Sequence, residues 1–184
     1  MTKEQHLQHL EKMSRAVTGE VDYDNHWQVL KSMCDIAKPK NILELGFNRG
    51  SSCLMFLYAS EAQIHSIDIL PEIAVQSSLE EINKHFGDRF KYTTLDHKDI
   101  GGQIDNFKDK YDFVFIDGNH TYEGMLRDAK NAISMNAKYL GFDDYYHPAH
   151  SKDCHKIVEE LGLEMVIEYK NYTGQALTIN PNHQ

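Results

Sequence analysis

Residues Asn41-Ile-Leu-Glu-Leu-Gly46-Phe-Asn-Arg-Gly50-Ser-Ser52 run from a short apolar segment through two glycines into a second apolar segment. This order predicts a buried strand, a tight turn and the start of a helix. Gly46 permits the tight turn and lets a ligand approach the backbone closely, and the residues after it suit a loop that enters a helix N-terminus. We predict a nucleotide-type cradle here. The alternative is an ordinary strand-to-helix turn of an α/β protein.

Short apolar runs alternate with longer segments along most of the chain. The predicted strands are residues 41–45, 63–67, 90–94, 111–116 and 138–142. The segments between them carry apolar side chains at helical spacing, as in residues 73–86 and 125–133. Strands that alternate with helices of this length predict βαβ crossovers and a mostly parallel, doubly wound sheet.

The C-terminal part departs from this alternation. After a predicted helix at 152–161, the runs 164–169 and 175–179 are separated by five residues, which is too short for a parallel crossover. Two helices, at about 3–18 and 25–37, are predicted before the first strand. The predicted fold class is therefore α/β, with a Rossmann-like, doubly wound, mostly parallel seven-stranded sheet, a C-terminal antiparallel hairpin and N-terminal helices.

The chain shows no internal repeat and no linker, and its 184 residues suit one domain. We expect a single domain over residues 1–184. Residues 1–38 are predicted to form a helical lid, or a layer packed on the sheet, and residues 39–180 the core.

The charge and the apolar runs limit the classes of partner. With 19 Lys and Arg against 28 Asp and Glu, the net charge is −9, which repels nucleic acid and anionic membrane surfaces. The longest uncharged apolar run, residues 53–59, is too short to cross a bilayer, and the first residues carry no secretory signal. We therefore expect a cytoplasmic protein with a small-molecule substrate, no nucleic-acid or membrane partner, and a chain compatible with a homodimer. The three scattered cysteines indicate no disulfide framework.

Two further strand ends carry candidate cofactor contacts. Asp68 ends the second strand, 22 positions after Gly46, where an acid can accept hydrogen bonds from both ribose hydroxyls of an adenosyl ligand. Asp96 and His97 follow the third strand, where such folds contact the adenine. The alternative for Asp68 is a helix-capping or loop aspartate.

Three acids follow the fourth and fifth strands. Asp117, Asp143 and Asp144 can converge, because ligands in open α/β sheets bind outside the carboxyl ends of the strands. Converging carboxylates raise each other's pKa values unless a cation compensates them, and Mg²⁺ prefers oxygen ligands. The sequence therefore predicts a divalent-cation site, with helix capping by Asp117 and Asp144 as the alternative.

Histidines lie on the same two loops. His120, three residues after Asp117, is the candidate base, since imidazole titrates near neutral pH. His147 and His150 are weaker candidates. A zinc site from these two with Cys154 and His155 is conceivable, although the spacing matches no standard pattern.

Four elements, in this order, together resemble the class I S-adenosylmethionine-dependent methyltransferases. They are residues 44–51 (Glu-Leu-Gly-Phe-Asn-Arg-Gly-Ser), 66–68 (Ser-Ile-Asp), 115–123 (Phe-Ile-Asp-Gly-Asn-His-Thr-Tyr-Glu) and 142–145 (Phe-Asp-Asp-Tyr). The chain is most similar to a small branch with an Asp-Gly-x-His-x-Tyr element after the fourth strand. That branch includes metal-dependent sugar O-methyltransferases of macrolide biosynthesis and proteins labelled cephalosporin hydroxylases. Catechol-type O-methyltransferases are more distant relatives.

The resemblance covers about residues 40–148 and implies roles for individual residues. It implies that Glu44, Gly46 and Gly50 line the methionine portion of the cofactor and that Asp68 holds the ribose. It also implies that the three acids bind the metal and that His120 is the base. The predicted cofactor-binding residues are Glu44, Gly46, Phe47, Asn48, Arg49, Gly50, Ser51, Asp68, Ile69, Asp96, His97 and Asp117.

The chain departs from the family in two ways. Asn48 stands where many members have glycine, and the chain lacks the large insertions that shape the substrate pockets of the sugar enzymes. The Asn/Asp-Pro-Pro-aromatic element of amino-methylating relatives is also absent after the fourth strand, which favours an oxygen acceptor.

We therefore predict an S-adenosylmethionine-dependent O-methyltransferase, assisted by Mg²⁺ or a similar cation, that acts on a hydroxylated small molecule such as a sugar or natural product. One alternative is an NAD-dependent oxidoreductase, against which the missing middle glycine of GxGxxG argues. Others are a catalytically silent adenosyl-ligand binding module and an iron-dependent oxygenase using Asp117, His120 and His147.

Overall fold

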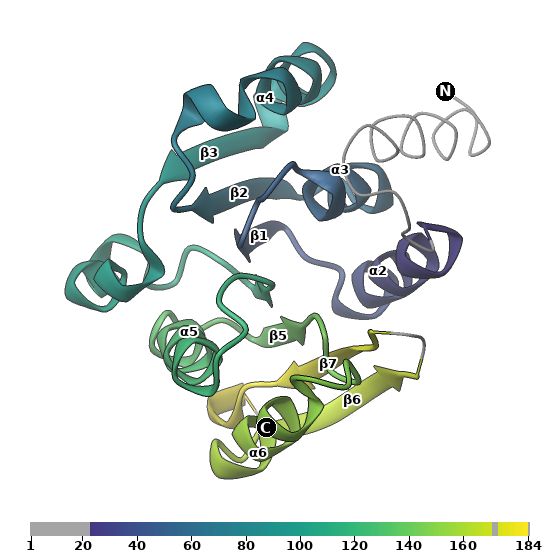
Figure 1. The fold of residues 1–184 in the computed structure, drawn as a ribbon, viewed down its shortest axis with the longest axis vertical. Coiled ribbons are helices and arrows are strands. Elements are labelled where there is room, and N and C mark those ends of the chain that lie inside the picture. Colours follow the sequence, from purple (N-terminus) through teal and green to yellow (C-terminus); the bar gives the residue numbers. More distant parts are fainter. Residues whose placement is uncertain (1–22, 171–172, 184) are drawn as a thin grey trace.

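A computed structural model describes residues 23–170 and 173–183 of the chain (Figure 1). The helices are α2 (Tyr23–Ala37), α3 (Ser51–Ala59), α4 (Glu72–Phe86), α5 (Tyr122–Ser134) and α6 (Ser151–Glu160). The strands are β1 (Asn41–Leu45), β2 (Gln63–Asp68), β3 (Phe90–Thr94), β4 (Phe113–Ile116), β5 (Tyr139–Phe142), β6 (Glu164–Tyr169) and β7 (Gln175–Ile179). Short 3₁₀ turns occupy Gly87–Arg89, His97–Asp99, Gly101–Asn106 and Pro181–His183.

The strands form one sheet in the order β3-β2-β1-β4-β5-β7-β6. Strands β1 to β5 are parallel to one another, whereas β7 runs antiparallel to both β5 and β6. The predicted fold class, including the C-terminal hairpin, is confirmed. Leu45 at the end of β1 pairs with both Ile67 and Ile116, so the carboxyl ends of β2, β1 and β4 lie level at one edge of the sheet.

Side chains alternate between the two faces of the sheet and build two cores. Ile42 of β1 packs with α2, α3 and α4 on one face, whereas Leu43 and Leu45 pack with α5 and α6 on the other. Figure 1 shows these helices on either side of the strands. Because both faces are covered, the loops at the edges are where a ligand can reach the sheet.

The segment before β1 is described only from residue 23. The helix predicted at about 3–18 lies outside the described residues, and the one predicted at 25–37 is confirmed by α2. Trp27, Leu30 and Met33 of α2 are buried against the core, so this helix forms a packed layer, and the lid function stays a prediction. Among the residues described, no helix has the length and apolar character needed to cross a membrane.

Candidate functional site

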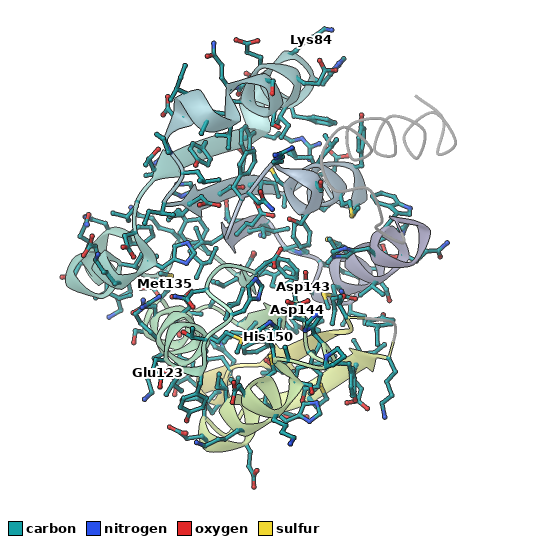
Figure 2. All side chains as sticks on the ribbon, in the orientation of Figure 1. Lys84, Glu123, Met135, Asp143, Asp144 and His150 are labelled. Atoms are coloured by element: carbon teal, nitrogen blue, oxygen red, sulfur yellow. The ribbon has the colours of Figure 1, made fainter. Side chains whose placement is uncertain are left out.

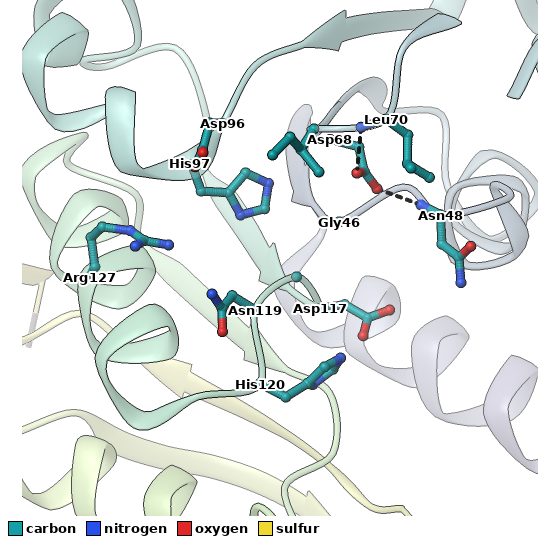
Figure 3. A pocket seen from close by; sticks show the side chains of 12 residues that line it. Gly46, Asn48, Asp68, Leu70, Asp96, His97, Asp117, Asn119, His120 and Arg127 are labelled. Atoms are coloured by element: carbon teal, nitrogen blue, oxygen red, sulfur yellow. Dashed lines mark hydrogen bonds between the residues drawn. The ribbon is translucent and has the colours of Figure 1, made fainter. Parts of the chain in front are cut away.

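A cavity of about 500 Å³ opens at the carboxyl ends of the central strands (Figure 3). Its volume lies in the range of small-molecule sites. It is lined by Gly46, Asn48, Asp68, Ile69, Leu70, Asp96, His97, Asp117, Gly118, Asn119, His120 and Arg127. These residues follow β1, β2, β3 and β4, apart from Arg127, which comes from α5.

The turn after β1 forms the floor between β1 and β4. Gly46 has φ +106°, and a Cβ built there would lie 2.1 Å from the carbonyl oxygen of Asp117. Its N–H donates to the Ile67 carbonyl, and Asp117 N–H donates to the Leu45 carbonyl, so the β1 and β4 turns are held together. Only glycine fits this position, because any side chain would collide with the neighbouring backbone.

Asp68 fixes this turn from the side of β2. One carboxylate oxygen, Oδ2, accepts from the N–H groups of Phe47 and Asn48 at 2.8 and 2.7 Å, and Oδ1 accepts from Leu70 N–H at 3.0 Å. A carboxylate offers about four acceptor positions. Three are therefore filled by the protein, which leaves one on Oδ1 for a ligand hydroxyl rather than the two expected from the sequence.

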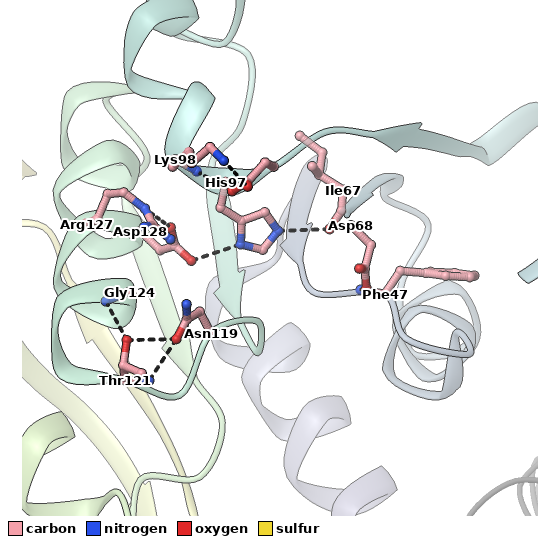
Figure 4. Close-up of polar contacts among 11 residues, drawn as sticks. Phe47, Ile67, Asp68, His97, Lys98, Asn119, Thr121, Gly124, Arg127 and Asp128 are labelled. Carbon is pink, nitrogen blue, oxygen red and sulfur yellow. Dashed lines mark hydrogen bonds and ion pairs between the residues drawn. The ribbon is translucent and has the colours of Figure 1, made fainter. Parts of the chain in front are cut away.

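A polar pair forms the wall beside β3 (Figure 4). His97 Nδ1 lies 3.0 Å from the carboxylate of Asp128, which is fully buried, and Nε2 lies 3.2 Å from the Ile67 carbonyl. Burial alone lowers the pKa of His97, but the hydrogen bond and charge of Asp128 and the Ile67 carbonyl raise it on balance. Both ring nitrogens of His97 face acceptors, which holds the ring in place in the wall, and Arg127 Nε lies 3.3 Å from Asp128.

Glu44 lies beneath the cavity rather than in it. It has no exposed surface, and its two carboxylate oxygens each accept a hydroxyl hydrogen bond of 2.5 Å, from Ser52 and Ser66. Burial raises its pKa to about 7, against the lowering effect of the two serines, and the charge of Asp68 raises it further. Glu44 therefore does not line the cavity, and its contact with the cofactor stays a prediction.

Four more predicted cofactor residues also lie away from the cavity. The ring of Phe47 is buried in the core against Phe90 and Tyr92, because the turn directs it under the sheet face. A Cβ on Gly50 would lie 2.6 Å from the Phe47 ring, so this glycine serves packing within the turn. Arg49 and Ser51 do not line the cavity.

The predicted acids after β4 and β5 lie close together. The pKa of Asp117 is raised well above its ordinary value, first by burial, then by the charges of Asp143, Glu44 and Asp144 and by a hydrogen bond with Asp143. Gln175 Nε2 donates to Asp143 Oδ1 at 2.6 Å. Figure 2 shows Asp143 and Asp144 at the end of β5. This arrangement of like charges fits a hard divalent cation, which would lower the pKa values that burial and repulsion raise.

The capping alternative for these acids is wrong. Helix α5 is capped by Thr121, whose Oγ1 accepts from Gly124 N–H at 3.1 Å, and Asn119 Oδ1 accepts from the Thr121 backbone and hydroxyl. Helix α6 begins after His150 without a side-chain cap. Asp117 and Asp144 therefore cap neither helix.

His120 extends from the β4 loop toward the loop after β5. Its Nδ1 lies 3.1 Å from Asp144 Oδ2, and its side chain is 39% exposed, so Nε2 can be reached from the cavity (Figure 3). A carboxylate on Nδ1 selects the tautomer in which Nδ1 carries the proton and Nε2 is free to accept one. The geometry therefore suits the role of base.

The alternative metal sets are not assembled as predicted. Cys154 is buried with its Sγ 3.5 Å from Met125 Sδ, and burial raises the pKa of its thiol to about 12, so it is no ligand in the zinc set. The His155 ring packs on Tyr145, 4.4 Å between centroids. Within the described part of the chain, the one group with ligand atoms within 4.8 Å of one another is His120, Asp144 and His150. Neither the three aspartates nor the iron set meets this criterion.

The sequence did not indicate four of the cavity residues: Leu70, Gly118, Asn119 and Arg127. Leu70, Gly118 and Asn119 adjoin predicted residues on the same loops, so their positions could have been included by extension. Arg127 lies mid-helix in α5 and carries no local signal. It reaches the cavity because α5 packs beside the turn after β3.

A protein-family model described as a methyltransferase domain matches residues 43–145, more than half of the chain. The chain belongs to this family of methyltransferases. This confirms the resemblance to class I S-adenosylmethionine-dependent methyltransferases that the four sequence elements predict.

Among curated proteins, the chain is 28% identical over 115 residues to a tRNA1(Val) (adenine(37)-N6)-methyltransferase from Flavobacteriaceae bacterium strain 3519-10. The match covers 62% of this chain and 47% of that protein, so the chain spans about half the length of this relative.

Solved methyltransferase structures share the whole fold. SAH-bound PaMTH1 from Podospora anserina superposes with a TM-score of 0.72, at 18% identity, over 97% of this chain and 88% of that one. The O-methyltransferase from Bacillus cereus in complex with SAH gives 0.72, at 16% identity, over 98% and 93%. TomG, the O-methyltransferase from Streptomyces achromogenes involved in tomaymycin synthesis, in complex with SAM, gives 0.67, at 16% identity, over 97% and 91%. At these identities the likeness concerns the fold.

Proposed function

We propose that this methyltransferase transfers the methyl group of S-adenosylmethionine to a hydroxyl oxygen of a small molecule, such as a sugar or natural product, with the help of a divalent cation such as Mg²⁺. The observation that carries the proposal is the group Asp117, Asp143 and Asp144 beside His120, of which Asp117 and His120 line the cavity. Burial and the charges of neighbouring acids raise the pKa values of Asp117 and Asp144, and these two acids cap neither adjoining helix. Their chemistry fits a hard cation.

The chain's residues would divide the reaction between the two halves of the cavity. When bound, S-adenosylmethionine supplies an electrophilic methyl group and the cation supplies a Lewis acid. Asp68 would accept a hydrogen bond from the ribose, and Ile69, which is exposed at the cavity, would cover one face of the adenine. Asp117, Asp143 and Asp144 would hold the cation.

His120 would take the proton from the acceptor hydroxyl at Nε2, while Asp144 holds Nδ1 and stabilises the imidazolium that results. With that proton removed, the acceptor oxygen would take the methyl group as its bond to the sulfonium sulfur breaks, which would release S-adenosylhomocysteine. Positioning of the two reactants in one cavity supplies much of the acceleration in such transfers.

An oxygen acceptor is favoured over the adenine nitrogen of the tRNA-modifying relative. The loop after β4 reads Asp117-Gly-Asn-His and lacks the Pro-Pro-aromatic element of amino-methylating enzymes. The net charge of −9 also disfavours a nucleic-acid substrate. The proposal therefore includes a small-molecule partner and the cytoplasmic location expected from the sequence.

The test combines cofactor binding with methyl transfer. Isothermal titration with SAH and with NAD separates the methyltransferase from the oxidoreductase, and we expect SAH alone to bind. Transfer of labelled methyl from S-adenosylmethionine to catechols and vicinal-diol sugars is then measured with Mg²⁺ and with excess chelator. Transfer that persists in full with chelator would show that the acids hold no essential cation, and SAH binding without transfer to any hydroxyl would favour a binding module.

A further inference from the structure

Two histidines and an acid form a second set of metal ligands on the outer side of the cavity. Ligand atoms of His120, Asp144 and His150 all lie within 4.8 Å of one another, and each side chain is partly exposed. The rings of His120 and His150 lie 5.2 Å apart between centroids, inclined at 31°. Figure 2 shows His150 next to Asp144, at the start of α6. The set therefore joins the loop after β4 to the loop after β5.

The backbone holds this set in place. Asp144 has φ +55°, which turns the chain sharply after β5, and its carbonyl accepts from His147 N–H at 3.0 Å. His150 N–H in turn donates to the His147 carbonyl at 3.0 Å, and the His150 carbonyl accepts from Cys154 N–H in the first turn of α6. The ring of His147 stacks on that of His150, 4.9 Å between centroids. These contacts place the His150 ring opposite His120.

We propose that His120, Asp144 and His150 form a binding site for a borderline divalent transition ion such as Zn²⁺. Imidazole nitrogens suit Zn²⁺, Co²⁺ and Ni²⁺, whereas Mg²⁺ prefers carboxylate oxygens and water. Two imidazoles and one carboxylate with an open fourth position form an established type of zinc coordination. Bonds of about 2.0–2.1 Å require the three side chains to close in on the ion, which rotation of partly exposed side chains allows.

Occupation of this site has a consequence that rests on the proposed function. His120 and Asp144 belong to both arrangements, as base and cation ligand in one and as zinc ligands in the other. A metal on His120 Nδ1, the nitrogen that faces Asp144, leaves the ring proton on Nε2, and a metal on Nε2 occupies that nitrogen directly. In either case Nε2 cannot accept a proton, so a transition ion at this site withdraws the base from the reaction. The two states therefore exclude each other, and Zn²⁺ inhibits the Mg²⁺-dependent methyl transfer.

The binding test does not depend on activity. Isothermal titration with Zn²⁺, and visible absorption of bound Co²⁺, are compared for the wild type, His150→Ala and the control His155→Ala. His155 lies on α6, exposed and outside the set, so its removal leaves the site intact. We expect one ion per wild-type chain, weakened about 10-fold or more in His150→Ala, since even outer partners of a metal site are worth about 10–100-fold.

Equal Zn²⁺ affinity in the wild type and His150→Ala, with both folded by circular dichroism, would overturn the site. A second variant, His120→Asn, removes the opposite ligand and must also weaken Co²⁺ binding and alter its spectrum. If His150→Ala fails to fold, this variant alone decides.

The inhibition test is separate. With Mg²⁺ saturating, Zn²⁺ should inhibit wild-type methyl transfer, and His150→Ala, compared with its own rate in the absence of Zn²⁺, should require about 10-fold or more Zn²⁺ for the same fractional inhibition. Equal inhibition of the two proteins would overturn the proposed exclusion. Absence of any Mg²⁺-dependent transfer would contradict the proposed function. The Zn²⁺ titration would still decide whether the metal site exists, because it does not depend on activity.

Discussion

The acids at the two sides of the cavity differ in their hydrogen-bond partners. At the ends of β1 and β2, Glu44 and Asp68 are satisfied inside the protein, by serine hydroxyls and by three backbone N–H groups. At the ends of β4 and β5, Asp117 and Asp143 lie against each other, and burial together with the charge of Asp143 raises the pKa of Asp117. The first half is a finished scaffold. The second half places acids beside one another, an arrangement that fits a bound cation.

This difference separates two uses of a buried carboxylate. An acid with hydrogen-bond donors on each oxygen fixes a turn and needs no cation to compensate its charge. An acid whose neighbours are other acids is destabilising until a cation binds, so its stability and its function oppose each other. Substitutions in the two halves should therefore change stability and activity in different combinations.

The largest effect is expected for Asp117→Asn. Folding raises the pKa of Asp117, so the protonated side chain contributes its full stability below the ordinary pKa of an aspartate. This stability is lost as the pH rises toward the pKa that Asp117 has in the folded protein. Asparagine stays neutral, so the free energy of unfolding should rise near pH 7, while Mg²⁺-dependent transfer falls about 10³-fold or more through loss of the Lewis acid.

Thermal unfolding, magnesium titration and methyl transfer together check this prediction. The exposed Asp105 gives a control, since Asp105→Asn changes the net charge equally and should alter none of them. A variant that loses both stability and activity would assign Asp117 to the scaffold, together with Asp68.

A second substitution in the same half, His120→Gln, should lower the rate of transfer about 10²–10⁴-fold, which is the usual contribution of a general base. Glutamine retains hydrogen bonding to Asp144 but cannot take up the proton. The pH profile of transfer at saturating Mg²⁺ is the decisive measurement, with His155→Gln as the control. Near-normal turnover with an unchanged profile would reject the base and leave the methyltransferase fold unaffected.

In the first half, Glu44→Gln should stabilise the protein without changing ligand binding. The pKa of Glu44 rises from 4.5 to about 7 on folding, so stability is full below pH 4.5 and is lost as the pH rises toward 7. Above pH 7 the loss amounts to about 3 kcal/mol, at 1.36 kcal/mol per unit. Glutamine can hydrogen-bond both serines at every pH.

Denaturant unfolding at pH 4 and pH 8 measures this effect, which should be near zero at the lower pH. The fully exposed Glu61 provides the control Glu61→Gln. SAH affinity should stay within a few tenths of a kcal/mol of the wild type. A large loss of SAH affinity would restore the cofactor role that the sequence predicted for Glu44.

The sequence predicts the fold well because its signals are local. Strand β2 was expected at 63–67 and ends one residue later at Asp68, and β4 was expected from 111 but begins at Phe113. There, the Asp112 carboxylate instead accepts from the backbone of Lys40 and Asn41, at the start of β1. Such end effects depend on neighbouring strands, which periodicity does not describe.

The site was predicted less completely, because burial and packing decide which side chains reach the cavity. Gly46 and Asp68 carry strong local signals at strand ends. Glu44 alternates with Leu43 and Leu45 and so lies on the opposite face of β1, beneath α3, where Ser52 meets it. Arg127 and the pairing of His150 with Asp144 arise from contacts between distant segments.

The smallest effect is expected for Asp68→Ala, which should weaken SAH binding by about 10- to 150-fold, the equivalent of one charge-assisted hydrogen bond of about 1.5–3 kcal/mol. Three of the acceptor positions of Asp68 already hold Phe47, Asn48 and Leu70 N–H. One ribose hydroxyl, rather than two, should therefore be coupled to this acid.

Calorimetric titration with adenosine, 2′-deoxyadenosine and 3′-deoxyadenosine tests this coupling in the wild type and in Asp68→Ala. The cost of the substitution should vanish for one deoxy analogue and persist for the other. Asn48→Ala keeps the backbone N–H that Asp68 accepts from, and serves as the control for the turn. If Asp68→Ala lowers the affinity for all three ligands equally, Asp68 affects binding only by holding the Gly46 turn. Its carboxylate would then make no direct contact with a ribose hydroxyl.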